Sequence, residues 1–165
     1  GKILENVWGA KRFLIYYMIT ALGAAALHLG VSQYEIMSLQ SQINPSDLNI
    51  LLENGRNVLE GNQNYTNALM GKLNLLINTP TVGASGAVFG ILLAFGMLFP
   101  NTLLYIYFAI PIKAKYFVMI YGALELYLGL SNNPADNVAH FAHLGGMLFG
   151  FILLKYWQKD RNTFY

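Results

Sequence analysis

A serine and a histidine near the starts of two apolar stretches are the residues of this chain best suited to chemistry. Ser85 lies in Gly83-Ala84-Ser85-Gly86, which opens one apolar stretch, and His143 lies near the start of another. A neutral imidazole can take the proton of a serine hydroxyl and return it to a leaving amine near pH 7. The pair therefore indicates hydrolysis by a nucleophilic serine in an apolar environment.

The composition is typical of a membrane protein. The 165 residues are 55% hydrophobic and only 11% charged, with a mean hydropathy of +0.42, whereas about a quarter of the residues of a soluble domain are charged. The absence of cysteine excludes disulfides, thiolate catalysis and thiolate-bound zinc. A net charge of +2 does not favour nucleic acid as a partner, and no cofactor is expected.

Four stretches are long and apolar enough to cross a bilayer, which takes about 20 residues. They are residues 13–31, 82–99, 116–130 and 138–157. The sequence thus predicts an all-α fold, a polytopic bundle of membrane helices with four spans present. The aromatic stretch at residues 103–111 is too short to span, and we interpret it as a re-entrant or interfacial segment.

A long polar insert, residues 32–81, separates the first two spans, and we expect it to pack on the membrane surface as a lid or spacer. Within it, the pattern predicts one short helix that is capped near Ser46 and runs to about Glu60, and a second over residues 66–77. Residues 1–165 are interpreted as one membrane domain that carries this insert, and the chain's beginning suggests a piece cut from a longer protein.

The positions of the basic residues predict the orientation of the helices. Eight of the ten lysines and arginines fall on one side of the bilayer under a single topology, and basic residues favour the cytoplasmic side. Ser85 and His143 then both enter from the extracytoplasmic face. Each lies roughly four or five residues into its predicted helix, on the order of 6 Å deep at about 1.5 Å per residue. We therefore expect a site that opens to the extracytoplasmic side.

Glycines on the second and fourth spans predict that these two helices touch, because small residues let helices in lipid approach closely. The glycines are Gly83, Gly86 and Gly90 on one helix and Gly146 and Gly150 on the other. Gly146 and Gly150 lie three and seven residues after His143, on its face of the helix. A close crossing there would bring the imidazole toward Ser85, although the glycines alone also suit ordinary helix packing.

The backbone around the serine is the expected source of oxyanion donors. The first turn of a helix has N–H groups without intrahelical acceptors, and such groups can stabilise an oxyanion. We expect Gly83, Ala84 and Gly86 to supply this backbone, with the glycines leaving room for the substrate chain. The spacing differs from that of soluble hydrolases, in which G-x-S-x-G follows a strand.

Taken together, these residues resemble the rhomboid family of intramembrane serine proteases. The similar motifs are GxSG at Gly83-Ala84-Ser85-Gly86 and AHxxGxxxG at Ala142, His143, Gly146 and Gly150. The resemblance implies Ser85 as nucleophile and His143 as base, cleaving transmembrane protein substrates in the lipid bilayer near its outer face. It also places Phe89, one turn after Ser85, against the imidazole, and leaves His140 to line the mouth of the site.

The resemblance also implies that parts of the enzyme are absent from this chain. The first residues are similar to the cytoplasmic turn between the family's second and third core helices, so the chain would hold roughly the third to sixth. In the family, the second helix supplies a histidine and an asparagine to the oxyanion hole, and no position here corresponds to them. We therefore expect an incomplete enzyme, and whether it is active on its own stays open.

Two other functions stay open on the sequence. A binding protein of rhomboid-like fold would retain membrane clients without cutting them, and a small transporter subunit would use Glu125 and the histidines. Glu125 is a lone acid within a span, and a structural hydrogen bond to a neighbouring helix is favoured over a proton path. His140 and His143 have a spacing that suits a metal, but Asp136 is the only third ligand suggested, so no metal is expected.

Overall fold

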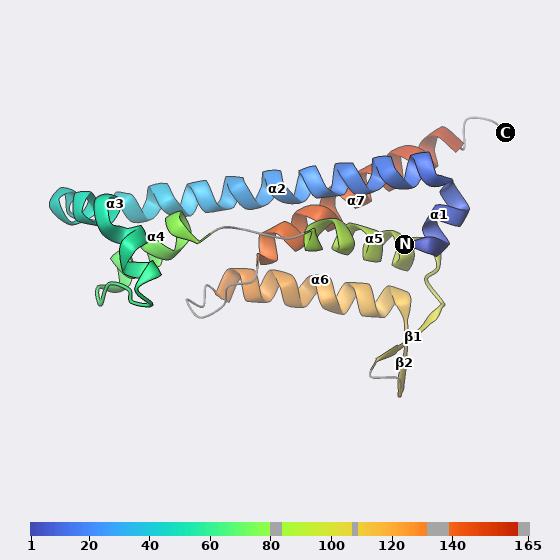
Figure 1. Cartoon of the computed structure of the whole chain (residues 1–165). Coiled ribbons are helices and arrows are strands. Elements are labelled where there is room, and N and C mark those ends of the chain that lie inside the picture. The colour runs from blue at the N-terminus through green and yellow to red at the C-terminus, as the bar shows by residue number, and fades with distance from the viewer. Residues whose placement is uncertain (80–83, 107–108, 132–138, 162–165) are drawn as a thin grey trace. The chain divides into compact units, whose positions relative to one another are not determined.

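The computed structural model describes residues 1–79, 84–106, 109–131 and 139–161, and most of them are helical (Figure 1). In chain order, the elements in these ranges are α1 (Lys2–Trp8), α2 (Ala10–Gln40), α3 (Pro45–Glu60), α4 (Ala68–Asn78), α5 (Ser85–Leu98), β1 (Leu103–Ile106), β2 (Ile110–Lys113), α6 (Ala114–Ser131) and α7 (His140–Arg161). The prediction of a helical protein is confirmed, with one short hairpin as the exception.

Helices α2, α5, α6 and α7 occupy the stretches predicted to span the membrane. Within the described ranges, α2 is the one helix that is long and apolar enough to cross a membrane by length and composition alone. Helix α5 is apolar but shorter. That all four helices cross a bilayer therefore stays a prediction.

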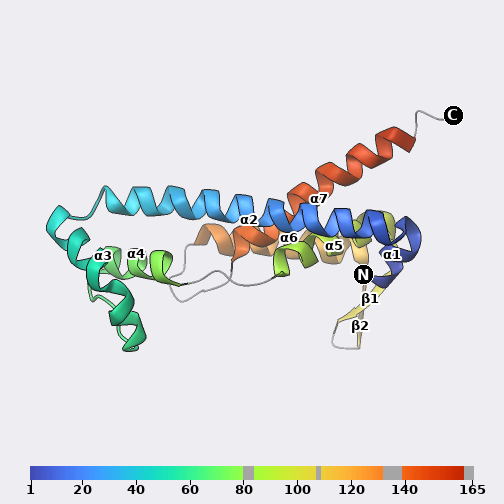
Figure 2. The same ribbon diagram turned by 45° about the horizontal axis from the view of Figure 1, so that its top comes forward.

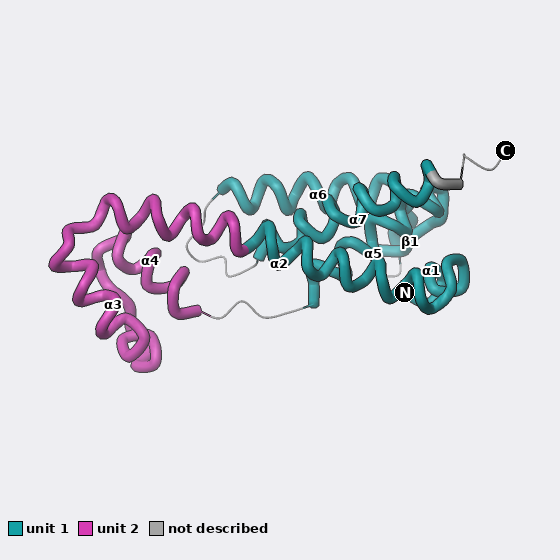
Figure 3. Tube along the Cα trace, turned by 90° about the horizontal axis from the view of Figure 1, so that it is seen from above, with its two compact units in different colours: residues 1–28, 83–165 teal, residues 29–82 magenta. Residues whose placement is uncertain are grey.

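The chain divides into two compact units, coloured separately in Figure 3. Unit 1 comprises residues 1–28 and 83–165, and unit 2 comprises residues 29–82. Unit 2 takes up the polar insert, but its first helical residues belong to α2, which ends at Gln40 and not near residue 31 as predicted. The helix continues because no glycine or proline follows Gly30 before Pro45.

Unit 2 contains the two short helices that the sequence predicts, with different starts. Helix α3 has Asn44 as its N-cap and Pro45 in its first turn, where a missing N–H costs nothing, so the predicted cap near Ser46 is wrong. Helix α4 begins after Asn67, whose side chain accepts hydrogen bonds from two backbone N–H groups of the first turn. The two helices share a small apolar core around Leu51 and Leu73, both fully buried.

Strands β1 and β2 form an antiparallel hairpin within the stretch interpreted as a re-entrant or interfacial segment, and its position relative to a membrane stays a prediction. Leu103 pairs with Lys113 and Ile106 with Ile110. Aromatic and β-branched residues favour strands, and Pro111 is tolerated because each strand of a two-stranded sheet is an edge. In Figures 1 and 2, the hairpin lies at the end of unit 1 that also holds α1.

Helix α1 was expected only as a turn. It ends at Trp8 and is followed by the C-cap residue Gly9, whose φ of 79° is a conformation that glycine adopts readily. The Gly9 N–H donates to the Glu5 carbonyl at 2.7 Å. The chain then continues directly into α2. Leu4 of α1 is buried against a cluster that includes Tyr16 and Leu154, so α1 is packed onto the rest of unit 1.

Glycines allow the backbones of α2, α5 and α7 to approach one another closely. A methyl group added at Gly146 of α7 would overlap the carbonyl oxygen of Gly86 on α5. A methyl group added at Gly90 would lie 2.9 Å from the Gly146 carbonyl oxygen, and one at Gly86 would lie 2.8 Å from that of Ala142. The backbones of α5 and α7 are therefore in contact over a full turn, and α5 and α7 run in the same direction (Figure 1).

Helix α2 closes this contact on its other side through residues spaced by four. Ala24 meets Gly86, and Thr20 lies against Gly90. One turn earlier, the buried Tyr16 hydroxyl donates a hydrogen bond to the Gly90 carbonyl at 2.8 Å. The Thr20 hydroxyl donates to the Tyr16 carbonyl within α2. The polar groups on this buried face are thus hydrogen-bonded, as burial requires.

We predict that Gly146→Ala destabilises the full-length protein by about 1–3 kcal/mol, the usual cost of overpacking. The reason is that the new methyl group would overlap a backbone carbonyl, which can move only if the helices separate. Thermal unfolding in detergent micelles measures the effect. Gly30→Ala adds the same methyl group to α2, where nothing lies within 4 Å, and should be neutral or stabilising. Equal unfolding temperatures for the two variants would contradict the prediction.

Candidate active site

Ser85 is the first residue of α5 and is exposed. The predicted position of four or five residues inside the helix is therefore wrong for the described chain. Ala84 is the N-cap residue, and Gly83 lies outside the described residues. The side chain of Ser85 thus stands beside the first-turn N–H groups of α5, where intrahelical acceptors are lacking.

His143 is held in the first turn of α7, which begins at His140. Its backbone N–H donates to the Ala139 carbonyl at 3.2 Å, and its side chain is buried. Gly146, one turn later on the same face, is the residue that contacts Gly86, and Gly86 directly follows Ser85. The crossing of the two helices consequently places the imidazole beside the hydroxyl.

Ser85 Oγ lies 2.9 Å from His143 Nε2, within hydrogen-bonding distance. The serine is accessible, as a nucleophile must be, whereas the histidine is only 7% exposed. With Nε2 unprotonated, the imidazole accepts the hydroxyl proton. This arrangement is chemically capable of nucleophilic attack by Ser85 with His143 as general base.

Phe89, one turn after Ser85, is stacked on the imidazole. The ring centroids of Phe89 and His143 are 4.0 Å apart and the planes differ by 8°. Tyr121 of α6 contacts the same phenyl ring, with centroids 5.6 Å apart. The phenyl ring therefore restricts the rotation of the His143 side chain on one face.

A buried carboxylate contacts the imidazole of His143 at its second nitrogen, Nδ1. Glu125 Oε2 on α6 lies 2.9 Å from His143 Nδ1 and 2.6 Å from His140 Nδ1. Glu125 is only 6% exposed. The expectation of a hydrogen bond between Glu125 and a neighbouring helix agrees with this geometry, but the contact between Glu125 and His143 was missed.

One sequence signal could have identified Glu125 as facing α7. It stands three residues after Gly122 and four before Gly129, so the three lie on one helical face. Both glycines meet α7: a methyl group at Gly122 would lie 3.1 Å from Met147, and one at Gly129 would lie 3.3 Å from the His140 Cβ. Small residues flanking a buried acid therefore marked the α6 face that packs on α7.

His140 was expected at the mouth of the site, but it is buried against Glu125. His140, His143 and Glu125 form a cluster of three potential metal ligands, whose ligand atoms lie within 4.8 Å of one another. Histidine and glutamate are residue types that bind zinc. Ligands around tetrahedral zinc stand about 3.3 Å apart, since each bond is about 2.0–2.1 Å. The separations of 2.6 and 2.9 Å are those of hydrogen bonds. Asp136, the third ligand suggested by sequence, lies outside the described residues.

The described glycines near the site pack against neighbouring helices. Gly86 was expected to leave room for a substrate backbone, but its Cα is covered by Ala24 and Ala142. Gly90 lies against Thr20, and Gly150 lies beside the Tyr16 hydroxyl. Of the residues proposed for the oxyanion and substrate backbone, Ala84 is therefore the described one whose surroundings are open, since it is exposed.

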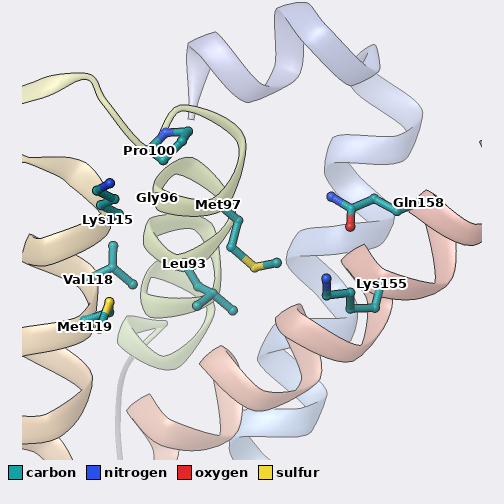
Figure 4. Close-up of a pocket in the computed structure, with 9 residues that line it drawn as sticks. All are labelled: Leu93, Gly96, Met97, Pro100, Lys115, Val118, Met119, Lys155 and Gln158. Carbon is teal, nitrogen blue, oxygen red and sulfur yellow. The ribbon is translucent and has the colours of Figure 1, made fainter.

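A hollow of about 380 Å³ lies at the other end of α5 and contains none of these residues (Figure 4). Its lining comes from the end of α5, the beginning of α6 and the end of α7, with Met97 between Lys115 and Lys155. The site around Ser85 is separate from it, at the start of α5.

Comparison with known proteins assigns the chain to a family. Residues 1–159 match the Rhomboid domain. An uncharacterised mitochondrial rhomboid protein of Schizosaccharomyces pombe is 36% identical over 87 residues, which are 49% of this chain and 22% of that protein. The chain thus spans only about a fifth of the length of that curated relative. No solved structure matches.

We predict that Phe89→Leu slows covalent labelling of Ser85 by a fluorophosphonate about 2- to 10-fold in the full-length protein. Loss of the stacked ring removes about 0.5–1.5 kcal/mol that holds the imidazole in place. The rate of labelling, followed by mass spectrometry, measures the effect. Phe95→Leu, which alters a ring of α5 that contacts Phe99, should label at the original rate. Equal slowing in both variants would count against the assigned role of Phe89.

Proposed function

Because the chain belongs to the rhomboid family, which is membrane-embedded and includes serine proteases, we propose that it is an intramembrane serine endopeptidase. The observation that carries this proposal is the distance of 2.9 Å between Ser85 Oγ and His143 Nε2. Its substrates are transmembrane segments of other proteins. No metal or cofactor takes part in the proposed reaction.

In the first half of the reaction, Ser85 Oγ attacks the carbonyl carbon of the scissile peptide bond as His143 Nε2 takes the hydroxyl proton. The carbonyl π electrons move to the oxygen and form a tetrahedral oxyanion. When this intermediate collapses, the C–N bond breaks and His143 gives its proton to the leaving amine. The products of this half are a free amine and an ester on Ser85.

In the second half, a water molecule takes the place of the amine. His143 Nε2 accepts a proton from the water as its oxygen attacks the ester, and the C–O bond to Ser85 then breaks. The proton returns from His143 to the serine oxygen. The peptide leaves as a carboxylic acid, and the enzyme regains its first state with all atoms balanced.

The backbone at the start of α5 is the proposed source of oxyanion stabilisation. Ala84 is the N-cap residue and is exposed next to Ser85, and N–H groups of a first helical turn point outward without intrahelical acceptors. Donors fixed in this way act most strongly where water is excluded.

The proposed substrate class follows from the surroundings of Ser85. The Ser85 hydroxyl lies at the start of α5, and the residues that follow it in this helix are almost entirely apolar. An extended apolar segment is therefore the substrate chain that fits best beside it. The distribution of lysines and arginines favours the extracytoplasmic side for that end of α5. Cleavage is therefore proposed near the outer boundary of the membrane.

We predict that Ser85→Ala and His143→Ala each lower cleavage of a transmembrane substrate by at least about 10³-fold in the full-length protein, since each removes a member of one chemical unit. Cleavage is measured on fluorescently labelled substrate in liposomes. Ser41→Ala, which alters an exposed serine of unit 2, is the matched control and should cleave normally.

The same experiment separates this proposal from a rhomboid-like binding protein. If the wild-type protein retains the substrate in pull-downs without cutting it, and does not react with a fluorophosphonate, the binding protein is the better description. Cleavage by Ser85→Ala at the wild-type rate would exclude Ser85 as the nucleophile.

A further inference from the structure

Glu125 and the two histidines make a hydrogen-bonded relay that ends at the proposed nucleophile. From the carboxylate, the relay runs from Glu125 Oε2 to His143 Nδ1 at 2.9 Å, and from His143 Nε2 to Ser85 Oγ at 2.9 Å. We infer that Glu125 is a positioning residue for His143, so that the site works as a Ser–His–Glu triad and not as a dyad. This inference rests on the proposed function.

The carboxylate determines which nitrogen of His143 carries the proton. A neutral imidazole has one N–H, and a carboxylate can only accept a hydrogen bond. The 2.9 Å contact is therefore satisfied when Nδ1 is protonated and donates to Glu125 Oε2. Nε2 then keeps its lone pair, which is the form that accepts the Ser85 proton. Without Glu125, the imidazole is free to adopt the opposite tautomer, in which Nε2 cannot act as a base.

Glu125 also stabilises the positive charge that forms on His143 during the reaction. When His143 takes the serine proton it becomes an imidazolium, and this cation is unfavourable in a buried, apolar setting. A carboxylate oxygen 2.9 Å from Nδ1 stabilises it, more strongly than it would in water because the surroundings screen less. The proton remains on His143 throughout, and Glu125 acts only through its charge and its hydrogen bond.

His140 holds the carboxylate in place from the same helix as His143. Its Nδ1 lies 2.6 Å from the oxygen that His143 contacts. The two imidazole planes are nearly perpendicular, at 87°, so both rings can point an N–H at one oxygen without overlapping. Gly129 of α6 lets His140 approach closely, since a side chain there would meet the His140 Cβ. His140 thus supports the triad through Glu125.

Kinetic and spectroscopic measurements on the full-length protein in liposomes test the inference. Glu125→Gln keeps the size of the side chain but adds an N–H that donates to Nδ1 and favours the wrong tautomer. We expect kcat to fall by about 10²–10⁴-fold with KM changed less than about threefold, and Glu125→Asp to recover part of the loss. Glu53→Gln, at an exposed glutamate of α3, is the matched control.

The protonation of His143 can be read without any variant at position 125. In protein labelled with ¹⁵N-histidine, assigned through His143→Gln, the His143 signals should show a protonated Nδ1 and an unprotonated Nε2. The opposite tautomer in the wild-type protein would overturn the inference even if Glu125→Gln failed to fold.

A double-mutant cycle tests the role of His140. His140→Ala alone should lower kcat by about 10-fold, because the carboxylate loses one of the two hydrogen bonds that hold it. In the Glu125→Gln background the same change should cost little more, since the oxygen that His140 holds is no longer a carboxylate. Additive losses would show that His140 acts independently of Glu125 and would overturn this part.

The outcomes distinguish this inference from the proposed function. Suppose that the wild-type protein cleaves, that Ser85→Ala does not, and that Glu125→Gln keeps the wild-type kcat. The proposed protease function is then supported, and the inference of a triad is overturned. If wild-type protein does not cleave and does not react with a fluorophosphonate, both fall together. Loss of folding in Glu125→Gln with the predicted tautomer in wild-type protein supports positioning by Glu125.

Discussion

The backbone contact between α5 and α7 is the constraint on which the rest of unit 1 depends. The Gly86 carbonyl occupies the space where a side chain at position 146 would stand, so the two helices meet at a distance that only glycine permits. Ser85 immediately precedes this contact, and His143 lies one turn before it on the other helix. A widening of about 1 Å at the crossing would take Ser85 Oγ and His143 Nε2 out of hydrogen-bonding distance.

Helix α2 makes this contact rigid from the third side. Ala24 and Thr20 fill the space beside Gly86 and Gly90, and the Tyr16 hydroxyl is hydrogen-bonded to the Gly90 carbonyl. In lipid, the hydrophobic effect does not drive helices together, and close packing and hydrogen bonds must do so. The three helices are therefore held together by close packing and hydrogen bonds, the two interactions that remain effective in a membrane. These interactions fix the geometry of the site.

The buried polar groups of the site satisfy one another. Glu125, His140 and His143 are each less than a tenth exposed, and an isolated carboxylate at such a position would cost several kcal/mol. Two imidazoles contact its Oε2, and within the described residues no buried side-chain nitrogen or oxygen lacks a hydrogen-bond partner. The same contacts that make the burial of Glu125 tolerable also orient the imidazole toward Ser85. Stability and the proposed chemistry thus depend on one cluster.

The sequence by itself determined the helical character of the chain, the polar insert, and the faces on which Ser85, His143 and the glycines lie, because spacing along a helix follows from its own periodicity. It did not reveal strands β1 and β2, which depend on pairing with each other, nor the end of α2 at Gln40. Only the tertiary structure decided that Glu125 meets His143. Residues 18 and 58 positions away from His143 contact opposite sides of its ring, and local periodicity carries no information about which helix faces are packed together.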